Sequence, residues 1–377
     1  MREVAVVGIG ETPARPVTPD VSYRELIYQA AMHAYEDAGI DHTEVDGFIS
    51  SAEDFLEGTS IFDEYVPDQI GGAMKPVYTV SADGIFSIIS GVMQIRSGIA
   101  DVVLIEAHSK ASEVVNIKDV LGLAYDPLYI APLKFDPYFL AGLEAQRYLF
   151  KHGIDRDALA SVVYMNKSNA ILNPLAAYSE RVPLQSLLTA PETYSPLTDM
   201  DISRHADYSC VMILAAEEVA KKLTDCPVWV RGVGFCSGSP NVDSRKLGVS
   251  DAARMAAQMA YSTAGVTPEE LDVAEVDDMF SHRELMHLEA LGLSDCPWAD
   301  ISSGEFLAGG LLPINTSGGA LGFGHVLEAS GLAKATEIVK QLRCEAGQRQ
   351  VDAELGLAHA WRGLPTESHG VVILEVD

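Results

Sequence analysis

Apolar residues recur along the chain with two different periods, and together these predict alternating strands and helices. Residues 4–10 form a short run of apolar, mostly β-branched side chains, which is typical of a buried strand. Residues 22–39 carry apolar side chains at helical spacing and end at Gly39, which suits a helix C-terminus. Residues 45–50 have the pattern of another strand. We therefore predict an opening strand–helix–strand unit in a parallel sheet.

The same pattern returns in the second part of the chain. Residues 34–46 read AYEDAGIDHTEVD and residues 260–272 read AYSTAGVTPEELD, so Ala, Tyr, Ala, Gly, Glu and Asp match at one constant offset. This offset also aligns Gly8 of the first strand with Gly234 of a later apolar run. Because strand, helix and acidic turn match in register, we interpret the chain as a duplication.

The remaining periodic segments complete two halves, which we predict at residues 1–225 and 226–377. The first half continues with a helix that opens at residues 81–84, a strand at 101–107, and a strand that leads into a helix at 207–217. In the second half we predict strands at 228–236, 273–276, 354–359 and 370–376, and helices at 250–264, 282–291 and 328–343. No linker separates the halves, so we expect them to share one large interface.

A long insertion in the first half, at about residues 110–205, follows neither period closely. It is rich in proline and aromatic residues and contains a helical stretch near residues 140–150. Insertions of this length often act as covers or specificity loops over a site. The alternative is that these aromatic side chains only pack against the rest of the molecule.

Composition and charge exclude several classes of protein. Of 377 residues 48% are hydrophobic, and 54 acidic against 26 basic residues give a net charge of -28, which argues against nucleic acid or an anionic membrane as partner. The five cysteines form no close pair, so we predict no disulfide framework and no metal site. The N-terminus begins directly with a strand, and no apolar run approaches membrane-spanning length. We therefore predict a soluble, cytoplasmic protein.

Residues 314–325 read INTSGGALGFGH and lead into the helical pattern of residues 332–342. Several glycines followed by one histidine and a helix predict a tight loop that places the imidazole of His325 at the mouth of that helix. The alternative is a glycine-rich connection in which the histidine is incidental.

The stretch from Asn315 to Gly331 reads N-x-x-G-G-A-x-G-x-G-H-x-x-x-A-S-G. It resembles the Asn-x-x-Gly-Gly…Gly-His-Pro…Gly-Ala-x-Gly signature of the thiolase superfamily, and looks closest to its lipid-transfer-protein-like, acetyl-CoA acetyltransferase-like branch. The resemblance implies an α/β thiolase fold, with two duplicated βαβ-type halves in a layered αβαβα arrangement and a loop insertion in the first half. It extends over essentially the whole chain.

Three positions depart from the family's catalytic pattern. Ser81, in Ser-Ala-Asp-Gly, aligns with the nucleophilic cysteine of the family's Cys-x-Ser-Gly. Asp277 stands where the related branch has the histidine of Val-His-Asp-x-Phe, and Gly356 aligns with the second catalytic cysteine of Cys-Leu-Gln-His-Asn-x-Gly. His325 is the member of the usual quartet that remains. Because a serine hydroxyl is far less acidic than a thiol, Ser81 needs a base within hydrogen-bond reach.

The resemblance implies roles for the residues at these motifs. His325 would polarise a thioester carbonyl, Asp277 would act as acid or base, and Ser81 would be a weak nucleophile or a donor, with His282 as a further candidate. Further catalytic, substrate or oxyanion positions are implied by the same motifs: His359, Asp83, Asn315, Gly324 and Gly363.

Each of these residues also has a purely structural interpretation. Ser81 suits a helix N-cap, with Asp83 in the first turn. Asp277 and Asp278 suit a solvated or capping pair. His108 suits a hydrogen-bonded histidine at a strand end.

Three functions stay open. The first is a divergent thiolase or acyltransferase that acts on a carbon–carbon bond of an acyl-CoA, with serine in place of the nucleophilic cysteine. The second is a retro-aldolase on a 3-hydroxyacyl-CoA, which needs no cysteine, and the third is a non-catalytic thiolase-like subunit of a complex. The resemblance implies a coenzyme A thioester as substrate, no tightly bound cofactor, a homodimer, and a small zinc-ribbon/OB-fold partner protein.

Overall fold

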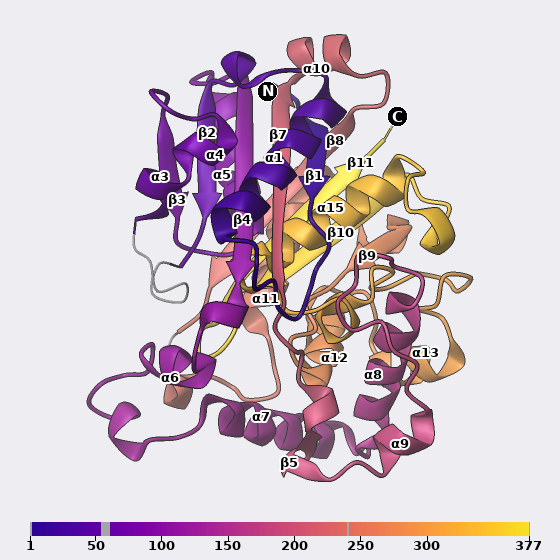
Figure 1. The fold of residues 1–377 in the computed structure, drawn as a ribbon. Helices are drawn as coiled ribbons and strands as arrows, with labels where there is room; N and C mark the ends of the chain where they lie inside the picture. Colours follow the sequence, from indigo (N-terminus) through magenta and orange to yellow (C-terminus); the bar gives the residue numbers. More distant parts are fainter. Residues whose placement is uncertain (1, 54–60, 240, 377) are drawn as a thin grey trace.

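The computed structural model describes residues 2–53, 61–239 and 241–376. Within these residues nine strands form one mixed sheet in the order β3-β2-β4-β7-β1-β8-β11-β10-β9 (Figure 1). Their bounds are β1 (Val4–Glu11), β2 (Gly47–Ser51), β3 (Val77–Val80), β4 (Val102–Lys110), β7 (Asp207–Ala216), β8 (Val228–Ser237), β9 (Val273–Glu275), β10 (Leu355–Trp361) and β11 (Ser368–Glu375). A separate hairpin pairs β5 (Glu192–Tyr194) with β6 (Leu197–Thr198).

The two parts of the sheet repeat one topology, which confirms the duplicated architecture. The order β2-β4-β7-β1 in the first part matches β9-β10-β11-β8 in the second, with one parallel and two antiparallel pairings in each. Where the first part adds β3, the second has an isolated parallel bridge between Ala274 and Ile314. The parts join where β1 pairs with β8. The predicted boundary at residues 225 and 226 falls just before β8.

The prediction of a parallel sheet is wrong, because the sheet is mixed. β2 runs parallel to β3 and β4, but β1 pairs antiparallel with both of its neighbours, β7 and β8. β1 and β2 point in the same direction, yet β4 and β7 lie between them.

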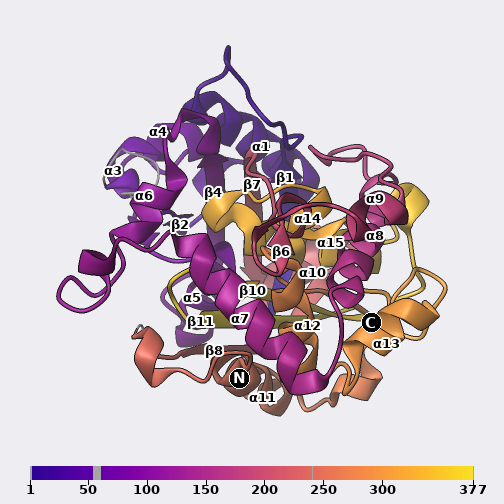
Figure 2. The ribbon, with the colours of Figure 1, turned by 90° about the horizontal axis from the view of Figure 1, so that it is seen from below.

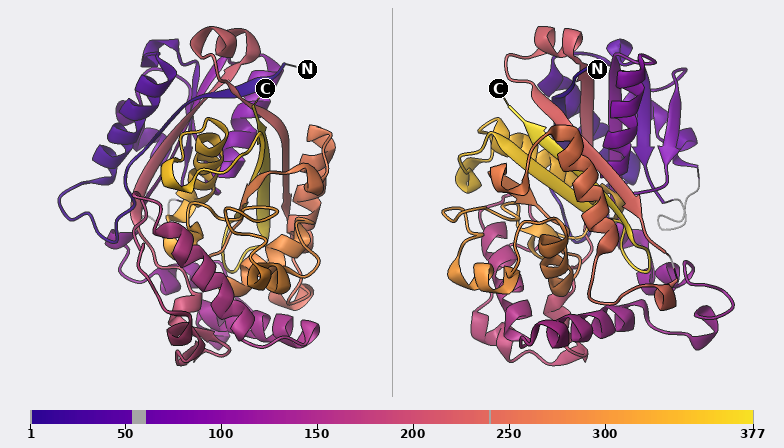
Figure 3. Two further views of the ribbon diagram at one scale, coloured as in Figure 1. Left: turned by 90° about the vertical axis from the view of Figure 1, so that its right-hand side faces the viewer. Right: turned by 180° about the vertical axis from the view of Figure 1, so that it is seen from behind.

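Helices form three layers around this sheet, as Figure 3 shows. α5 (Gly84–Ser97) and α15 (Ser330–Leu342) fill the middle layer, and α1 (Tyr23–Ala38) and α11 (Asp251–Ala264) cover the two outer faces. Each layer has its own buried apolar cluster. The remaining helices are α3 (Phe62–Tyr65), α4 (Pro67–Ile70), α6 (Ile117–Gly122), α7 (Pro137–His152), α8 (Asp157–Ala170), α9 (Leu184–Leu188), α10 (Glu217–Leu223), α12 (Ser281–Ala290), α13 (Pro297–Ser303) and α14 (Gly319–Gly322).

Glycines in β1 and β8 let the outer helices lie directly on the strands. A Cβ on Gly10 would lie 2.1 Å from the carbonyl oxygen of Ala30, and one on Gly234 would lie 2.0 Å from that of Ala256. Gly10 and Gly234 are therefore structural equivalents, and Gly8 corresponds to Gly232. The predicted match of Gly8 with Gly234 is wrong by two residues, because the connection from β8 to α11 is longer than that from β1 to α1.

Most predicted helices and strands are present, whereas the insertion contains more structure than predicted. Gly39 ends α1 in the left-handed conformation at φ 66°, as expected. The short edge strand β3 and the helix α8 were not predicted. α6 to α9 lie in the lower part of the molecule in Figure 1, and Figure 2, seen from below, shows α7 running across this face with α8 to one side. In the part of the chain that the structure describes, no helix is both long and apolar enough to span a bilayer.

Candidate active site

The two helices of the middle layer begin beside each other, and Asp83 joins their N-termini. Its Oδ1 accepts the Ile85 N–H of α5 at 2.9 Å, and its Oδ2 accepts the Gly331 N–H of α15 at 2.8 Å. A Cβ on Gly331 would lie 1.9 Å from Asp83 Oδ1, so glycine is required for this approach. The partial positive charges of two helix N-termini thus meet at one carboxyl group.

Burial raises the pKa of Asp83 to about 7, although two backbone N–H groups and the positive charge of Lys334 oppose this shift. The Asp83 side chain is almost completely buried. A carboxyl group with such a pKa can accept and return a proton near neutral pH.

The glycine loop is shaped by close contacts with neighbouring elements. Gly319 has φ +56°, and a Cβ there would lie 2.2 Å from Asp278 Oδ2. Asp278 accepts the Ala320 and Leu321 N–H groups at 2.6 and 2.9 Å, and so caps α14. The interpretation of Asp278 as a capping residue is confirmed, and that of a solvated pair is wrong because Asp277 and Asp278 are both buried.

His325 follows this loop and is fixed by backbone hydrogen bonds to the end of the insertion. Its N–H donates to Arg204 O at 2.8 Å, and its carbonyl accepts the Ala206 N–H at 3.0 Å. Its ring lies edge-on to that of His205, with centroids 5.0 Å apart. The loop therefore places its imidazole at a defined position, as the sequence predicted.

The imidazole of His325 is neutral at physiological pH. Burial, then the nearby His205 and Lys334, lower the pKa of His325 well below its usual range. The Leu327 N–H donates to Nδ1 at 3.4 Å, so the ring proton lies on Nε2. Burial also lowers the pKa of His205 to about 4. His325 can thus donate one hydrogen bond from Nε2 without carrying a charge.

Asp83 and His325 line the same pocket. Both halves and the insertion contribute to its wall, which is mainly apolar with a few polar groups. The described lining residues are Asp83, Ile117, Leu121, His205, Met279, His325, Leu327, Glu328, Trp361, Arg362 and Gly363. An apolar pocket with a few convergent polar groups is the usual form of a small-molecule site.

Ser81 lies outside the described wall of this pocket. It is exposed and precedes the cap of α5 by two residues, and the cap is Asp83. The structural interpretation of Ser81 as the N-cap is therefore wrong, because the Asp83 side chain accepts the first free N–H of the helix. Its catalytic role stays a prediction.

Asp277 lies behind the pocket wall. Its Oδ2 is 3.7 Å from Lys334 Nζ, and its Oδ1 accepts the N–H of Met279, which lines the pocket. Its own N–H donates to Nδ1 of His359 at 3.3 Å, and His359 is buried beside His369.

Of the remaining predicted residues, one lines the pocket, and the others line a neighbouring cavity or form hydrogen bonds within the fold. Gly363 lines the pocket, and Gly324 lines a neighbouring cavity. Asn315 accepts the Val276 N–H at 2.7 Å and donates to Glu284, so it fixes the end of β9. The ring of His282 lies 3.2 Å from a carboxylate oxygen of Glu144, and His108 is hydrogen-bonded to Glu106 in β4. The structural interpretation of His108 predicted such a hydrogen bond. Neither histidine is among the described lining residues of the pocket.

The sequence did not identify three residues that line this pocket, which are His205, Trp361 and Arg362. It also did not identify Lys334, which lies behind the wall beside Asp277. His205 occurs in an irregular segment with no motif, and Lys334 occurs as one polar residue in an amphipathic helix, so nothing in their spacing reveals these positions. Arg362 forms an ion pair with Glu53, which is distant in sequence.

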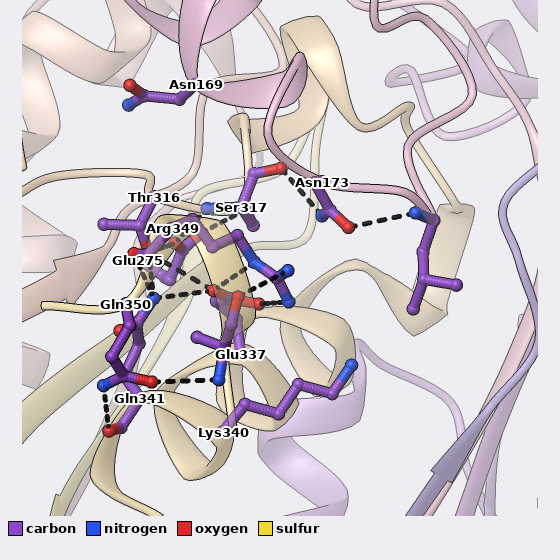
Figure 4. Close-up of polar contacts among 12 residues, drawn as sticks. Asn169, Asn173, Glu275, Thr316, Ser317, Glu337, Lys340, Gln341, Arg349 and Gln350 are labelled. Carbon is purple, nitrogen blue, oxygen red and sulfur yellow. Dashed lines mark hydrogen bonds and ion pairs between the residues drawn. The ribbon is translucent and has the colours of Figure 1, made fainter. Parts of the chain in front are cut away.

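A second polar cluster, which includes Glu337 and Gln341 of α15, is shown in Figure 4. Here Glu275 accepts from the Ser317 N–H and Oγ at 2.9 and 2.5 Å, and Glu337 accepts from Nε and Nη2 of Arg349, both at 2.8 Å. Gln341 donates to Glu337 at 2.9 Å. Burial and the charge of Glu337 raise the pKa of Glu275 to about 7. We call these residues the carboxylate cluster.

Comparison with known proteins agrees with this architecture. The family model "Thiolase C-terminal domain-like" matches residues 236–376. An acetyl-CoA acetyltransferase from Methanothermobacter thermautotrophicus is 32% identical over 369 residues, 95% of this chain and 96% of that protein. Human sterol carrier protein 2 is 28% identical over 95% of this chain and 70% of its own length. The solved structure of an "Ltp2-ChsH2(DUF35) aldolase" has a TM-score of 0.87 at 23% identity, covering 100% of this chain and 98% of that chain.

The fold and these relatives define a thiolase-like protein. The chain belongs to the thiolase superfamily, in the branch of the acetyl-CoA acetyltransferases and the sterol carrier protein 2 thiolases.

Proposed function

We propose that this protein cleaves or forms a carbon–carbon bond of an acyl-CoA by acid/base chemistry at Asp83 and His325, as a retro-aldolase on a 3-hydroxyacyl-CoA. One observation carries this proposal: the pocket pairs a protonatable carboxyl group with a neutral imidazole donor, while none of the five cysteines is among its described lining residues. Acid/base cleavage of a 3-hydroxyacyl thioester needs these two groups and no thiolate.

In the proposed step, the Asp83 carboxylate removes the proton of the 3-hydroxyl group. The C2–C3 bond breaks, its electron pair enters the thioester as an enolate, and the released carbon leaves as an aldehyde or ketone. His325 Nε2–H donates to the enolate oxygen, where negative charge develops. The Asp83 carboxyl then returns its proton to C2, which restores the enzyme and gives the shortened acyl-CoA.

We assign the role of base to Asp83, although the sequence pointed to Asp277, because of where the two side chains lie. Asp83 lines the pocket, whereas Asp277 lies behind Met279 and beside Lys334. We propose a positioning role for Asp277: it holds the segment that carries Met279 into the wall.

A second candidate is acyl transfer through Ser81, in which the Ser81 Oγ bonds to the acyl carbon, the rest of the substrate leaves, and the acyl-enzyme then passes the acyl group to an acceptor. It is favoured by the place of Ser81 just before α5, where the family resemblance puts the nucleophile, and by the acetyltransferase name of the relative above. It requires a base for the hydroxyl group, and among the described residues no hydrogen-bond partner of the Ser81 side chain is present.

We also propose that the protein works in a complex, as a homodimer with a small zinc-ribbon/OB-fold partner, in the cytoplasm. Exposed apolar side chains gather in the insertion, where Val115, Leu123, Leu128 and Tyr129 are each about three-quarters exposed or more. Exposed apolar surface of this kind often marks an interface with another protein. The name of the similar aldolase, Ltp2-ChsH2(DUF35), includes a DUF35 component. The remaining alternative is a non-catalytic subunit of such a complex.

The test incubates the protein with 3-hydroxyacyl-CoA substrates, alone and co-expressed with a DUF35-type protein from the same source. Mass spectrometry measures the products and the intact mass of the chain. The aldolase proposal expects a free aldehyde or ketone, a shortened acyl-CoA and an unmodified chain. An acyl adduct on Ser81 would support the second candidate instead, and no cleavage in either preparation would support the non-catalytic subunit.

A further inference from the structure

Three buried histidines from different elements meet behind the pocket. They are His287 of α12, His359 of β10 and His369 of β11, and one ring nitrogen of each lies within 4.8 Å of the others. All three side chains are completely buried. Among the residues that the structure describes, this is the one group with donors suited to holding a metal ion in this way. We call these residues the histidine cluster.

The strands give the cluster a rigid base. β10 and β11 pair antiparallel, with His359 opposite Val371 and Trp361 opposite His369. His359 and His369 are therefore diagonal neighbours on one face of the sheet, with ring planes only 12° apart. His287 comes from the helix above that face, and its ring lies edge-on to both of the others.

Two of the histidines already make the outer hydrogen bonds typical of metal ligands. His287 Nδ1–H donates to the carbonyl oxygen of Asp277 at 2.8 Å, and His369 Nε2–H donates to Glu367 Oε2 at 3.2 Å. Metal-ligating histidines usually donate their second ring N–H to a carbonyl or carboxylate, which directs the other nitrogen's lone pair at the ion. Nε2 of His287 is buried and has no hydrogen-bond partner among the described residues.

The separations of the nitrogens suit a small transition-metal ion. His359 Nε2 and His369 Nδ1 are 3.1 Å apart. Metal–nitrogen bonds of about 2.0–2.1 Å place two ligands of a tetrahedral ion roughly 3.4 Å apart. The His359–His369 pair thus already has nearly the separation that one ion requires, and the ligand nitrogen of His287 lies within 4.8 Å of both.

We propose that the histidine cluster binds one divalent transition-metal ion of the class that prefers imidazole, with Zn²⁺ as the first candidate, and that this ion is structural. Imidazole ligands suit zinc, copper and nickel, whereas carboxylates suit magnesium and calcium. The three rings are not among the described lining residues of the pocket, so the ion would brace its wall. The sequence predicted no metal site because its five cysteines form no close pair. The three histidines are scattered along the chain, and only the fold brings them together.

Binding changes one hydrogen bond of the metal-free arrangement. His359 Nδ1 accepts the Asp277 N–H at 3.3 Å, so its ring proton lies on Nε2 and points at His369. A metal ion on Nε2 requires this proton to move to Nδ1, which releases the Asp277 N–H. Metal occupancy is therefore coupled to the segment that carries Met279 into the pocket.

The test is a titration of chelator-treated, full-length protein with Co²⁺. Binding at the cluster, with a water molecule as the fourth ligand beside the three imidazoles, is expected to give the visible absorption of a four-coordinate ion. It should saturate at one equivalent per chain, be displaced by Zn²⁺, and raise the unfolding temperature. Loosely held Co²⁺ on the acidic surface keeps its water ligands and gives only weak six-coordinate absorption. The absence of a four-coordinate signal in the wild-type protein would overturn the proposal, whatever the behaviour of any variant.

Variants locate the ion. His287→Gln and His369→Gln are each expected to lower the affinity for Co²⁺ more than about 100-fold, since each removes a direct ligand. His42→Gln changes an exposed histidine and is expected to leave the titration unchanged. If the four-coordinate signal persists in folded His287→Gln and His369→Gln, the ion binds elsewhere and the proposal fails.

Discussion

The pocket and the carboxylate cluster contain similar groups but differ in what those groups contact. Asp83 in the pocket and Glu275 in the carboxylate cluster are both buried, and both have a pKa raised to about 7. Glu275 accepts hydrogen bonds from the Ser317 and Thr316 side chains, and its neighbour Glu337 is held by Arg349. Asp83 accepts only backbone N–H groups and lines a pocket together with His325.

The difference shows that a raised carboxyl pKa does not by itself mark a catalytic group. Structural networks also shift pKa values, because burial penalises the charge wherever it occurs. What separates Asp83 from Glu275 is access to a pocket that also holds a neutral donor. The variants below test this distinction, in order of their expected effect on turnover.

The largest loss is expected for His325→Ala. It removes the Nε2–H that donates to the developing oxyanion, so kcat/KM for carbon–carbon cleavage should fall about 10²- to 10³-fold. The unfolding temperature should change little, since the backbone bonds of residue 325 remain. His42→Ala, at an exposed site, is the matched control and should keep full activity. Wild-type turnover by folded His325→Ala would show that His325 takes no part in the reaction and would contradict the proposed use of this pocket.

Asp83→Asn should lower kcat/KM of the folded variant about 10²-fold, because asparagine cannot accept a proton. Its amide oxygen can still cap α5, but its amide N–H₂ then faces the Gly331 N–H, so the variant should also be less stable. The base acts when it is ionised, so wild-type kcat/KM should rise with pH through about 7 and level off above it. Steady-state kinetics at pH values on both sides of 7 measure this rise of kcat/KM with pH, which should be absent in Asp83→Asn.

Glu275→Gln is the control for that pH dependence, since Glu275 has a similar pKa but lies in the carboxylate cluster. In this variant kcat/KM should still rise with pH through about 7, as in the wild type. Loss of this rise in Glu275→Gln would assign the titration to the carboxylate cluster and not to Asp83.

Arg349→Met should affect stability far more than turnover. It leaves the buried Glu337 carboxylate without its two guanidinium hydrogen bonds, which should lower the free energy of unfolding by about 3–5 kcal/mol. Denaturant unfolding measures this loss. Under conditions where the variant is folded, kcat/KM should remain within about threefold of wild type, because Arg349 does not line the reaction pocket. A large loss of turnover in the folded variant would show that the reaction in the pocket depends on the carboxylate cluster.

The smallest effect is expected for Ser81→Ala. Ser81 is exposed and does not cap α5, so stability should change by no more than about 0.5 kcal/mol. Turnover should be unchanged if the chemistry uses Asp83 and His325. A loss as large as that of His325→Ala would instead favour covalent acyl transfer, and intact-mass measurement would then show whether Ser81 carries the acyl group.

Much of the fold could be predicted because it depends on local patterns. Helical spacing predicts α1, α7 and α11, and Gly39 marks the end of α1. The repeated Ala-Tyr-x-x-Ala-Gly reveals the duplication. The register of that repeat could not be predicted, because it depends on Gly10 and Gly234 lying against helix carbonyls. The direction of β1 relative to its neighbours depends on pairing with β7, about two hundred residues later.

The part of the site that a single loop forms could be predicted from the sequence. The part that forms where distant segments meet could not. The glycine loop places His325 as expected. The choice between Ser81 and Asp83 as the cap of α5 depends on which side chain reaches both Ile85 N–H and Gly331 N–H, and Gly331 belongs to the other half. His205 and the histidine cluster are assembled only by tertiary packing.

The most direct test of the account is a crystal structure with a non-cleavable 3-hydroxyacyl-CoA analogue bound in the pocket. We expect the thioester oxygen within hydrogen-bond distance of His325 Nε2 and the 3-hydroxyl group within hydrogen-bond distance of the Asp83 carboxyl. A complex in which the thioester carbon lies against Ser81 Oγ, with Asp83 remote from the substrate, would contradict it.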